Sequence, residues 1–555
     1  MRRLLGLVVA TALVLGACGS EEESGDSGAV SAAVEEQLAY LEPESALVVA
    51  VDMRYEEENW ESLRAIVDRG LEATREAADP EERADIPPDA EAALSALTRS
   101  LNLDFEDDVR PLLDGHLVMG RALPPGRDDP QERLTVVYRT AEGDLRRALE
   151  KALDNSELRP MPGQDDVLVA EEGIALVGDD TLLLAGTAEE VTAAVERAEA
   201  GRGFSPELLA AAEESAGIDD PLVLATGTLD LAREFLEEDN LERAVAEVPY
   251  LAAVERVDAA LDVSGEGVEA SATVATTGAE LSEDDLPLGP AGEIELPVVE
   301  DAVAGGSRDQ SRITTFAARV MRSAFADSDF VATIEETERE LGIKFEDEVL
   351  RQFNCPSVST FEPDPGVPLG AGGRFSARSC VRDPERMREL LPELAPRLPR
   401  ILSAMRGLGG EGLFGLLMLA PDAPLAPGAM LMQIGVAPLG GGAQDEQLYE
   451  VSGLREAEPG EPVFAGPDRV VFGMIGDVFV VGSDRQAALE AATLETEPAS
   501  EEAASALRVS PRALAGEFGG GTAEVVLERV FEPFEIGFSA DPRATRAHAR
   551  IPLAD

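Results

Sequence analysis

The sequence predicts an α+β fold in which two related units, each built from antiparallel hairpins packed with helices, follow one another along the chain. Short apolar stretches such as 46–51 and 135–138 are typical of strands, and residues 60–74 carry apolar side chains at helical spacing. No regular alternation of strands and helices indicates a parallel sheet. Of the 555 residues 44% are hydrophobic, so the chain is able to bury cores and is long enough for several domains.

The first twenty residues, MRRLLGLVVATALVLGACGS, have the order of a secretory signal peptide. Two arginines precede an apolar run over 4–17, and Cys18 follows that run directly. The four residues LGAC at 15–18 resemble the lipobox of bacterial lipoproteins. That resemblance implies that residues 1–17 are removed and that Cys18 becomes the lipidated first residue of the mature chain.

Two other interpretations of this N-terminal segment are open. A membrane-spanning helix is disfavoured because fourteen residues rise about 21 Å, less than the roughly 30 Å of a hydrocarbon core. If the protein were secreted without a lipid, the cysteine directly after the apolar run would be a coincidence. We therefore expect a protein that is lipid-anchored at the extracytoplasmic face of the cell membrane.

Composition places the domain boundaries. Residues 18–37 are expected to form the lipidated cysteine and a flexible linker, because Gly, Ser and Glu follow directly after Cys18. A polar, acidic stretch over 277–292 contains proline and is typical of a domain junction. The first α+β repeat is therefore placed at 38–280 and the second at 281–555.

Sequence matches in the same order indicate a tandem duplication. LNLDFEDD from Leu101 matches LGIKFEDE from Leu341, 240 residues later. In each unit a strand-like stretch and a charged helix follow, and the second of these helices begins with Asp383 at the expected N-cap and Pro384 at the first position. Two hairpins with a Gly-Asp turn, around Gly178 and Gly476, and two terminal hairpins complete the match.

The offset between the units locates an insertion. It rises from 240 to 298 (476 − 178), so the second unit holds about 58 extra residues (298 − 240). They include an apolar, Gly-rich segment near 405–445. We predict that this segment contacts lipid or a partner protein, and the alternative is an extra helix and strand packed on the second core. The candidate contact residues are Leu413, Phe414, Leu416, Leu417, Met418, Met430 and Met432.

Charge excludes several functions. A formal net charge of −63 argues against nucleic-acid binding and against adhesion to anionic lipid by charge. Aromatic residues make up only 4% of the chain, which disfavours stacked platforms for sugars. We interpret the acidity as solubility or adaptation to salt, with a cation-binding role as the alternative. The expected partners are the membrane, through the N-terminal lipid, and an envelope protein.

Two cysteines remain after Cys18. Cys355 and Cys380 form an even pair in an oxidising compartment, and we expect a structural disulfide between them. Two thiols without a neighbouring histidine make a poor metal site, and a redox pair normally has two residues between its cysteines. A disulfide across this loop contributes roughly 3–4 kcal/mol in the chain-entropy description.

No motif for catalysis is present. The chain has two histidines, His116 and His548, and lacks the GxSxG, HExxH, P-loop and dinucleotide-binding patterns. Ser311 has no base in a partner motif, so it is expected to cap a helix. A pair of catalytic carboxylates stays open, since 109 acidic residues make any one pair uninformative. We expect no enzyme, no cofactor and no metal.

Two charged patterns have competing interpretations. Arg546, His548 and Arg550 alternate onto one face of a strand, either as an anion-binding strip or, as we favour, as the solvated face of an edge strand. The acidic clusters after Phe105 and Phe345 lack the spacing of a calcium-binding loop. They are expected to open helices, with carboxylates near the positive end.

Together, the lipobox, the FEDD and FEDE helices and the Gly-Asp hairpins resemble a bacterial envelope family, the domain-of-unknown-function family numbered three-three-five-two. The resemblance covers about residues 38–555 and implies an envelope location, without an activity or site residues. The expected function is non-catalytic binding or scaffolding at the cell envelope. The alternatives are a solute-binding lipoprotein of a transporter and an envelope hydrolase that uses acidic residues.

Overall fold

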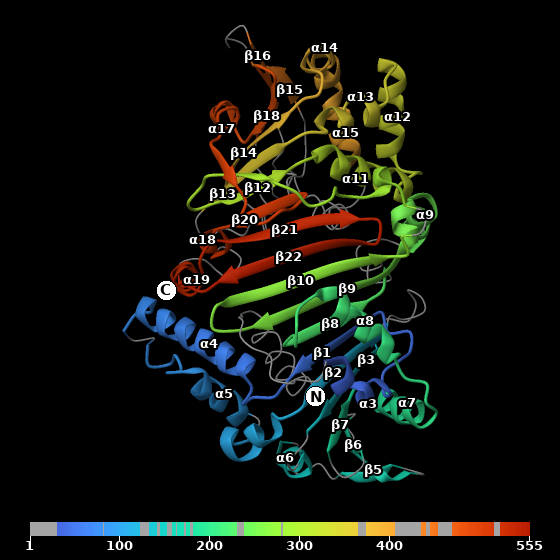
Figure 1. Ribbon diagram of the computed structural model, residues 1–555, viewed down its shortest axis with the longest axis vertical. Coiled ribbons are helices and arrows are strands. Elements are labelled where there is room, and N and C mark those ends of the chain that lie inside the picture. Colours follow the sequence, from blue (N-terminus) through green and yellow to red (C-terminus); the bar gives the residue numbers. More distant parts are fainter. Residues whose placement is uncertain are drawn as a thin grey trace.

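In the computed structural model the described residues form one 20-stranded antiparallel sheet with helices packed on it, and a separate two-stranded ribbon of β11 (Glu295–Pro297) and β19 (Thr496–Pro498) (Figure 1). This confirms the predicted α+β class. The residues that the structure describes are 30–554 apart from 81–82, 101, 123–132, 141–144, 153–157, 162–163, 171–173, 178–180, 230–237, 279–280, 365–372, 406–434, 440–444, 453–468 and 516–521.

Ten neighbouring strands of the sheet come from the first half of the chain. From the edge of the sheet towards its centre they are β4 (Arg159–Met161), β5 (Gln164–Ala170), β6 (Ile174–Val177), β7 (Leu182–Ala185), β3 (Arg133–Arg139), β2 (His116–Ala122), β1 (Leu47–Asp52), β8 (Val223–Gly227), β9 (Val254–Val263) and β10 (Gly267–Thr276).

The other ten strands come from the second half and follow the same order from the opposite edge. They are β15 (Gly435–Pro438), β16 (Glu446–Ser452), β17 (Arg469–Ile475), β18 (Val478–Gly482), β14 (Gly373–Cys380), β13 (Ser357–Pro363), β12 (Val303–Ser307), β20 (Ser505–Val509), β21 (Phe534–Asp541) and β22 (Ala544–Pro552). The two lists correspond position by position. The halves meet where β10 pairs with β22 over nine residue pairs.

The helices also divide between the halves. The first half has α2 (Val30–Ala33), α3 (Glu35–Leu38), α4 (Glu58–Ala77), α5 (Ala90–Arg99), α6 (Leu145–Ala152), α7 (Ala188–Glu199), α8 (Pro206–Ala216), α9 (Glu238–Glu247) and α10 (Pro249–Ala253). The second half has α11 (Gln310–Ala324), α12 (Asp329–Leu341), α13 (Phe345–Glu348), α14 (Pro384–Leu394), α15 (Leu398–Met405), α17 (Arg485–Ala491), α18 (Pro511–Leu514) and α19 (Thr522–Val530). Among the described residues, no helix is both long and apolar enough to span a membrane.

Residues 30–37 correct the predicted linker. They form α2 and most of α3 instead of a flexible tether. Val30, Val34 and Leu38 recur every fourth residue, so they lie on one helical face, and each is at most 1% exposed in the core. The linker was predicted from the Gly, Ser and Glu residues that follow Cys18, and this composition does not reveal the short apolar face of 30–38.

In the first half, both faces of the sheet are covered. On what we call the first face, Val48, Val118 and Leu184 belong to a core with α2, α3, α7 and α8. On the second face, Val51 and Leu117 belong to a core with residues of α4 and α6. Burial on both faces explains why the strands are short continuous apolar runs rather than alternating ones.

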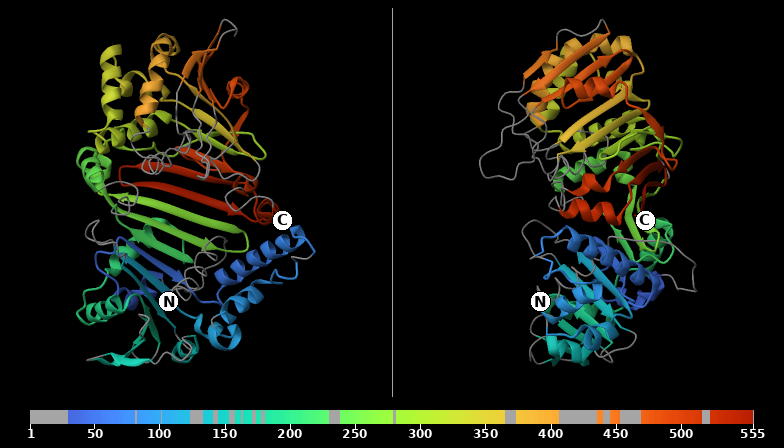
Figure 2. Two further views of the ribbon diagram at one scale, coloured as in Figure 1. Left: turned by 180° about the vertical axis from the view of Figure 1, so that it is seen from behind. Right: turned by 90° about the vertical axis from the view of Figure 1, so that its left-hand side faces the viewer.

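Helices connect the halves at both ends of the central strands (Figure 2). At one end α4 packs on α19, where Arg529 pairs with Glu76. At the other end α9 and α10 pack near α11: the Ser323 hydroxyl donates to Glu247 at 2.8 Å, and the rings of Tyr250 and Phe316 lie 5.4 Å apart. The halves therefore share helix contacts as well as a sheet.

Local signals in the sequence place several elements correctly. The Asp383 carboxylate accepts from the Arg386 N–H at 2.9 Å and caps α14, with Pro384 in its first turn. The acidic clusters open short helices, at Phe105–Val109 and at α13. In the β17–β18 turn Gly476 has a φ of 54°, which glycine adopts without strain.

Candidate functional site

The predicted strip Arg546, His548 and Arg550 lies on the first face of β22. β22 is not an edge strand, because it pairs with β10 on one side and with β21 on the other. This prediction was wrong for a topological reason. Each half ends in a hairpin, β9–β10 in the first and β21–β22 in the second, and the last strand of each hairpin pairs with the other half. The C-terminal strand β22 therefore lies at the centre of the sheet.

Each member of the strip has a carboxylate partner. His548 lies between two of them, with its Nε2 2.9 Å from Glu269 and its Nδ1 3.4 Å from Glu501. The two arginines pair with Asp541 (2.6 Å, from Arg546) and Glu266 (3.2 Å, from Arg550). Two of these contacts, His548 with Glu269 and Arg550 with Glu266, connect the halves across the β10–β22 seam. The strip is therefore compensated by carboxylates and is a poor site for an anion.

Ser271 is the cross-strand neighbour of His548 in β10. A serine beside a histidine that contacts carboxylates has the residue types of a nucleophilic triad. However, the Ser271 hydroxyl is shielded from solvent and has no hydrogen-bond partner, and both imidazole nitrogens already face carboxylates. A substrate could not reach this oxygen, so the arrangement does not make an active site.

A second polar cluster lies where β1 ends. Asp52 is 1% exposed and is paired with Arg54, whose Nη2 lies 2.6 Å from Oδ2. Trp60 donates from its indole nitrogen to the Asp52 carbonyl at 2.8 Å. His116 Nε2 is 3.9 Å from Asp52 Oδ1, which is too long for a hydrogen bond. The cluster fixes the end of the strand and does not contain an Asp–His dyad.

The pKa of His116 is lowered by this environment. Burial is the main cause, and the nearby Arg54 guanidinium acts in the same direction, while the Asp52 and Asp220 carboxylates oppose them. The imidazole is therefore held neutral beside a charge-compensated pair. The hydrogen bonds that Arg54 donates to the Asp52 carboxylate raise the pKa of Arg54, which keeps the guanidinium charged.

The acidic clusters are held by cations of the chain itself. Glu106 lies 2.9 Å from Arg110, and Glu346 lies 2.5 Å from Arg319. Burial opposes ionisation of Glu346, but Arg319 lowers its pKa overall. In the part of the chain that the structure describes, no group of three or more His, Cys, Asp or Glu side chains is arranged to hold a metal ion.

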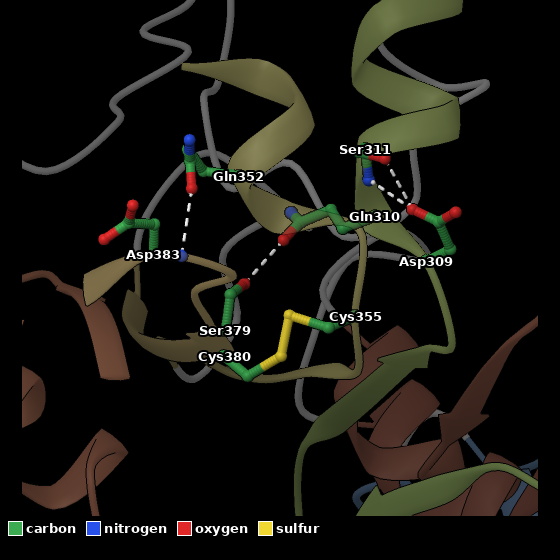
Figure 3. The surroundings of a disulfide bond; sticks show 8 residues. All are labelled: Asp309, Gln310, Ser311, Gln352, Cys355, Ser379, Cys380 and Asp383. Carbon is green, nitrogen blue, oxygen red and sulfur yellow. Dashed lines mark hydrogen bonds between the residues drawn. A yellow bond between two sulfur atoms is a disulfide. The ribbon is translucent and has the colours of Figure 1, made fainter. Parts of the chain in front are cut away.

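The predicted disulfide between Cys355 and Cys380 is present, with a Cα–Cα distance of 5.9 Å (Figure 3). It connects the residues before β13 to the end of β14. Nearby, Asp309 caps α11 by accepting from the Ser311 N–H at 3.1 Å, and the Ser311 hydroxyl donates to the same carboxylate. The cap is therefore Asp309, and Ser311 is a buried residue of the first helical turn.

A row of four buried serines was missed by the sequence analysis. Ser505, Ser307, Ser357 and Ser379 are directly paired across four neighbouring strands and share the second face. The Ser379 hydroxyl donates to Gln310 of α11 at 2.6 Å, whereas the Ser357 hydroxyl has no partner. Each serine lies at one end of its strand, but only the register shows that the four are adjacent.

Towards the centre of the sheet the same row becomes apolar. Ala225, Ala259, Ala272 and Ala547 are paired in register across β8, β9, β10 and β22, and Ala272 is exposed. This part of the row therefore carries only methyl side chains.

Cys18 and the seven candidate contact residues lie outside the described residues. The contact residues are Leu413, Phe414, Leu416, Leu417, Met418, Met430 and Met432. The described flanks of this segment are α15, which ends at Met405, and β15, which is mostly exposed.

Comparison with known proteins adds little. No family model and no curated protein matches the chain. A solved structure titled "Structure of crystal form III of TP0453" is similar at 8% identity, over 44% of this chain and 81% of that one, with a TM-score of 0.22. A likeness of that size carries no argument about fold or function.

Proposed function

We propose that this protein is a lipid-anchored component of the extracytoplasmic face of the cell membrane and acts there by binding or scaffolding rather than by catalysis. The signal sequence and the cysteine at position 18 support the anchor. The envelope family that the sequence resembles supports the location. That this chain belongs to that family is part of the proposal.

The buried carboxylates carry the non-catalytic part of the proposal. Among the described residues four are buried, and each pairs with a cation: Asp52 with Arg54, Asp108 with Lys151, Asp258 with Arg256, and Glu338 with Arg322. A catalytic acid needs a raised pKa. Burial raises those of Asp108 and Glu338, but their cationic and backbone donors lower them overall. These groups hold the fold together.

Glu91 is a carboxyl group with a raised pKa, and it is exposed. Its hydrogen bond with Glu106 is the main cause, and the negative charge of Glu106 adds to it. Glu106 is also paired with Arg110. A glycosidase-type pair flanks a bound substrate, and an exposed pair beside an arginine does not offer that setting.

The transporter alternative is also less well supported. Solute-binding proteins normally have two lobes with parallel sheets around a cleft. Every described strand pairing here is antiparallel, and the two halves share one sheet. An architecture of this kind is better suited to contact with another protein than to closing around a solute.

The test of the anchor is fractionation of cells that express the full chain or its Cys18→Ser variant. Wild type should take up radiolabelled palmitate and remain with membranes, and the variant should do neither. Retention of the variant on membranes to the same extent as wild type would overturn the proposal. The Cys380→Ser variant serves as a control that removes a different cysteine.

A further inference from the structure

His548 lies at the centre of the seam between the halves. β10 and β22 form nine residue pairs, and the middle pair is Ser271 with His548. The imidazole projects onto the first face and is 36% exposed. A change of its charge therefore takes place where the halves meet, at a position that protons from the solvent can reach.

The imidazole has a carboxylate at each of its nitrogens, and the two carboxylates come from different halves. Glu269 of β10 faces Nε2 at 2.9 Å, and Glu501, in the connection 499–504 between β19 and β20, faces Nδ1 at 3.4 Å. A carboxylate only accepts hydrogen bonds, and a neutral imidazole has a single N–H. Neutral His548 would therefore satisfy one carboxylate and turn a lone pair towards the other, whereas the imidazolium has an N–H for each.

Other contacts hold the connection 499–504 near its two ends. Near its start, the Ser500 N–H and hydroxyl donate to Glu535 of β21 at 2.7 and 2.6 Å. Near its end, the Ala503 N–H donates at 2.9 Å to a backbone carbonyl of the chain that precedes β11. Glu501 lies between these points and is exposed. Its contact with His548 therefore ties the middle of the connection to β22.

The elements packed around His548 carry further charged groups. These are Arg546 and Arg550 on β22 itself, which pair with Asp541 and Glu266; Glu535 on β21, which pairs with Arg508; Asp258 and Asp262 on β9, of which the second is directly opposite Glu269; Glu502 in the connection; and Glu207, Glu213 and Glu214 on α8, which packs on β10. Carboxylates ordinarily titrate near about pH 4 and guanidiniums above about pH 12. Histidine is the one residue type in this cluster whose charge ordinarily changes between about pH 5 and 8.

We propose that protonation of His548 holds the middle of the connection 499–504 on the seam, so that this part of the first face is closed at mildly acidic pH and opens above neutral pH. A hydrogen bond between two charged groups is the stronger kind, and deprotonation removes both the positive charge and one N–H. The halves stay joined throughout by the β10–β22 ladder, so the change is confined to the connection. The inference concerns the folded body and does not depend on the proposed function.

Hydrogen exchange measured by mass spectrometry tests the proposal on the full chain. Exchange in peptides that cover 499–504 would be measured at about pH 5.5 and about pH 7.5, on either side of the ordinary histidine value, and corrected for the intrinsic chemical rate at each pH. In wild type we expect protection to fall about threefold between the two, the size of effect that a partly exposed ion pair gives. In His548→Gln it should be equal at both pH values. A pH dependence that persists in His548→Gln, or none in wild type, would overturn the proposal.

Further variants separate this contact from a general effect of charge. His116→Gln removes the other histidine of the chain and should keep the pH dependence of wild type. Glu501→Gln should abolish that dependence, whereas Glu502→Gln, the same exchange at the next exposed residue, should retain it. Equal responses in the two glutamate variants, with both folded by circular dichroism, would contradict the pairing of Glu501 with His548.

Discussion

The two halves have the same strand order but different side chains at the same place in the sheet. On the second face, four paired positions at the ends of neighbouring strands are apolar in the first half and serine in the second: Val223/Ser505, Val51/Ser307, Leu117/Ser357 and Tyr138/Ser379. Leu117 and Ser357 are separated by the same 240 residues as the acidic helices. The topology therefore does not require an apolar layer here.

The two halves differ in the interactions at the equivalent ends of β1, β2 and β3 and of β12, β13 and β14. In the first half this layer belongs to a core with Trp60, Tyr55 and Phe105. In the second half the Cys355–Cys380 disulfide lies next to this row, two residues before Ser357 and one residue after Ser379. The equivalent positions in the first half are Gly115 and Arg139. A side-chain atom on Gly115 would lie 1.8 Å from the Arg139 carbonyl, so no cross-link fits there. At this place the first half buries apolar side chains, and the second half has a covalent cross-link.

The largest effect on stability should come from placing in the first half the serine that the second half has at the equivalent position. Leu117→Ser removes a buried leucine, which costs about 2–5 kcal/mol, and leaves a buried hydroxyl unpaired, which adds about 1–3 kcal/mol. We expect a loss near 5 kcal/mol in the free energy of unfolding, measured by denaturant titration with the fluorescence of Trp60, the sole tryptophan. A loss under 1 kcal/mol would show that the two corners are interchangeable.

The next effect should come from the disulfide. Replacing both Cys355 and Cys380 by serine should lower stability by about 3–4 kcal/mol through the entropy of the unfolded chain. Hydrogen exchange should accelerate in β12, β13 and β14 and stay within about twofold of wild type in β1, β2 and β3, since local stability differs across a structure. Equal acceleration in both sets of strands would break the proposed contrast.

A smaller effect should depend on pH. The pKa of His116 is lowered in the folded protein, mainly by burial, so the unfolded chain binds the proton more readily. This contribution to stability is present above the ordinary histidine value of about 6.5 and is lost as the pH falls below it. Below about pH 6.5, the free energy of unfolding should therefore change less steeply with pH in the His116→Gln variant than in wild type. An unchanged slope would show that His116 does not titrate in unfolding.

The smallest effect should be at Ser357. Its hydroxyl is buried without a partner, so Ser357→Ala removes a desolvated polar group and should change stability by less than about 1 kcal/mol, in the stabilising direction. Ser379→Ala is the matched comparison, because that hydroxyl donates to Gln310 and its loss should destabilise. The same denaturant titration would measure both. Destabilisation of similar size in both variants would show that Ser357 has a partner, such as a buried water.

Local features were predictable from the sequence, and long-range ones were not. The cap at Asp383, the Gly476 turn and the cysteine pair depend on neighbouring residues or on a simple count. The β10–β22 seam depends on pairing between strands almost 280 residues apart, for which local patterns carry no signal. The central position of His548 and the adjacency of the serines follow from that register, so both were missed.

Recovery of a partner tests the central claim, which is binding or scaffolding at the envelope, most directly. Cells would be cross-linked intact, and the full lipoprotein would be purified from the membrane fraction in parallel with its Cys18→Ser variant. We predict one or a few envelope proteins that co-purify with wild type and are depleted with the variant. Recovery of the wild-type protein alone, together with turnover of an envelope polymer by the purified chain, would contradict the account.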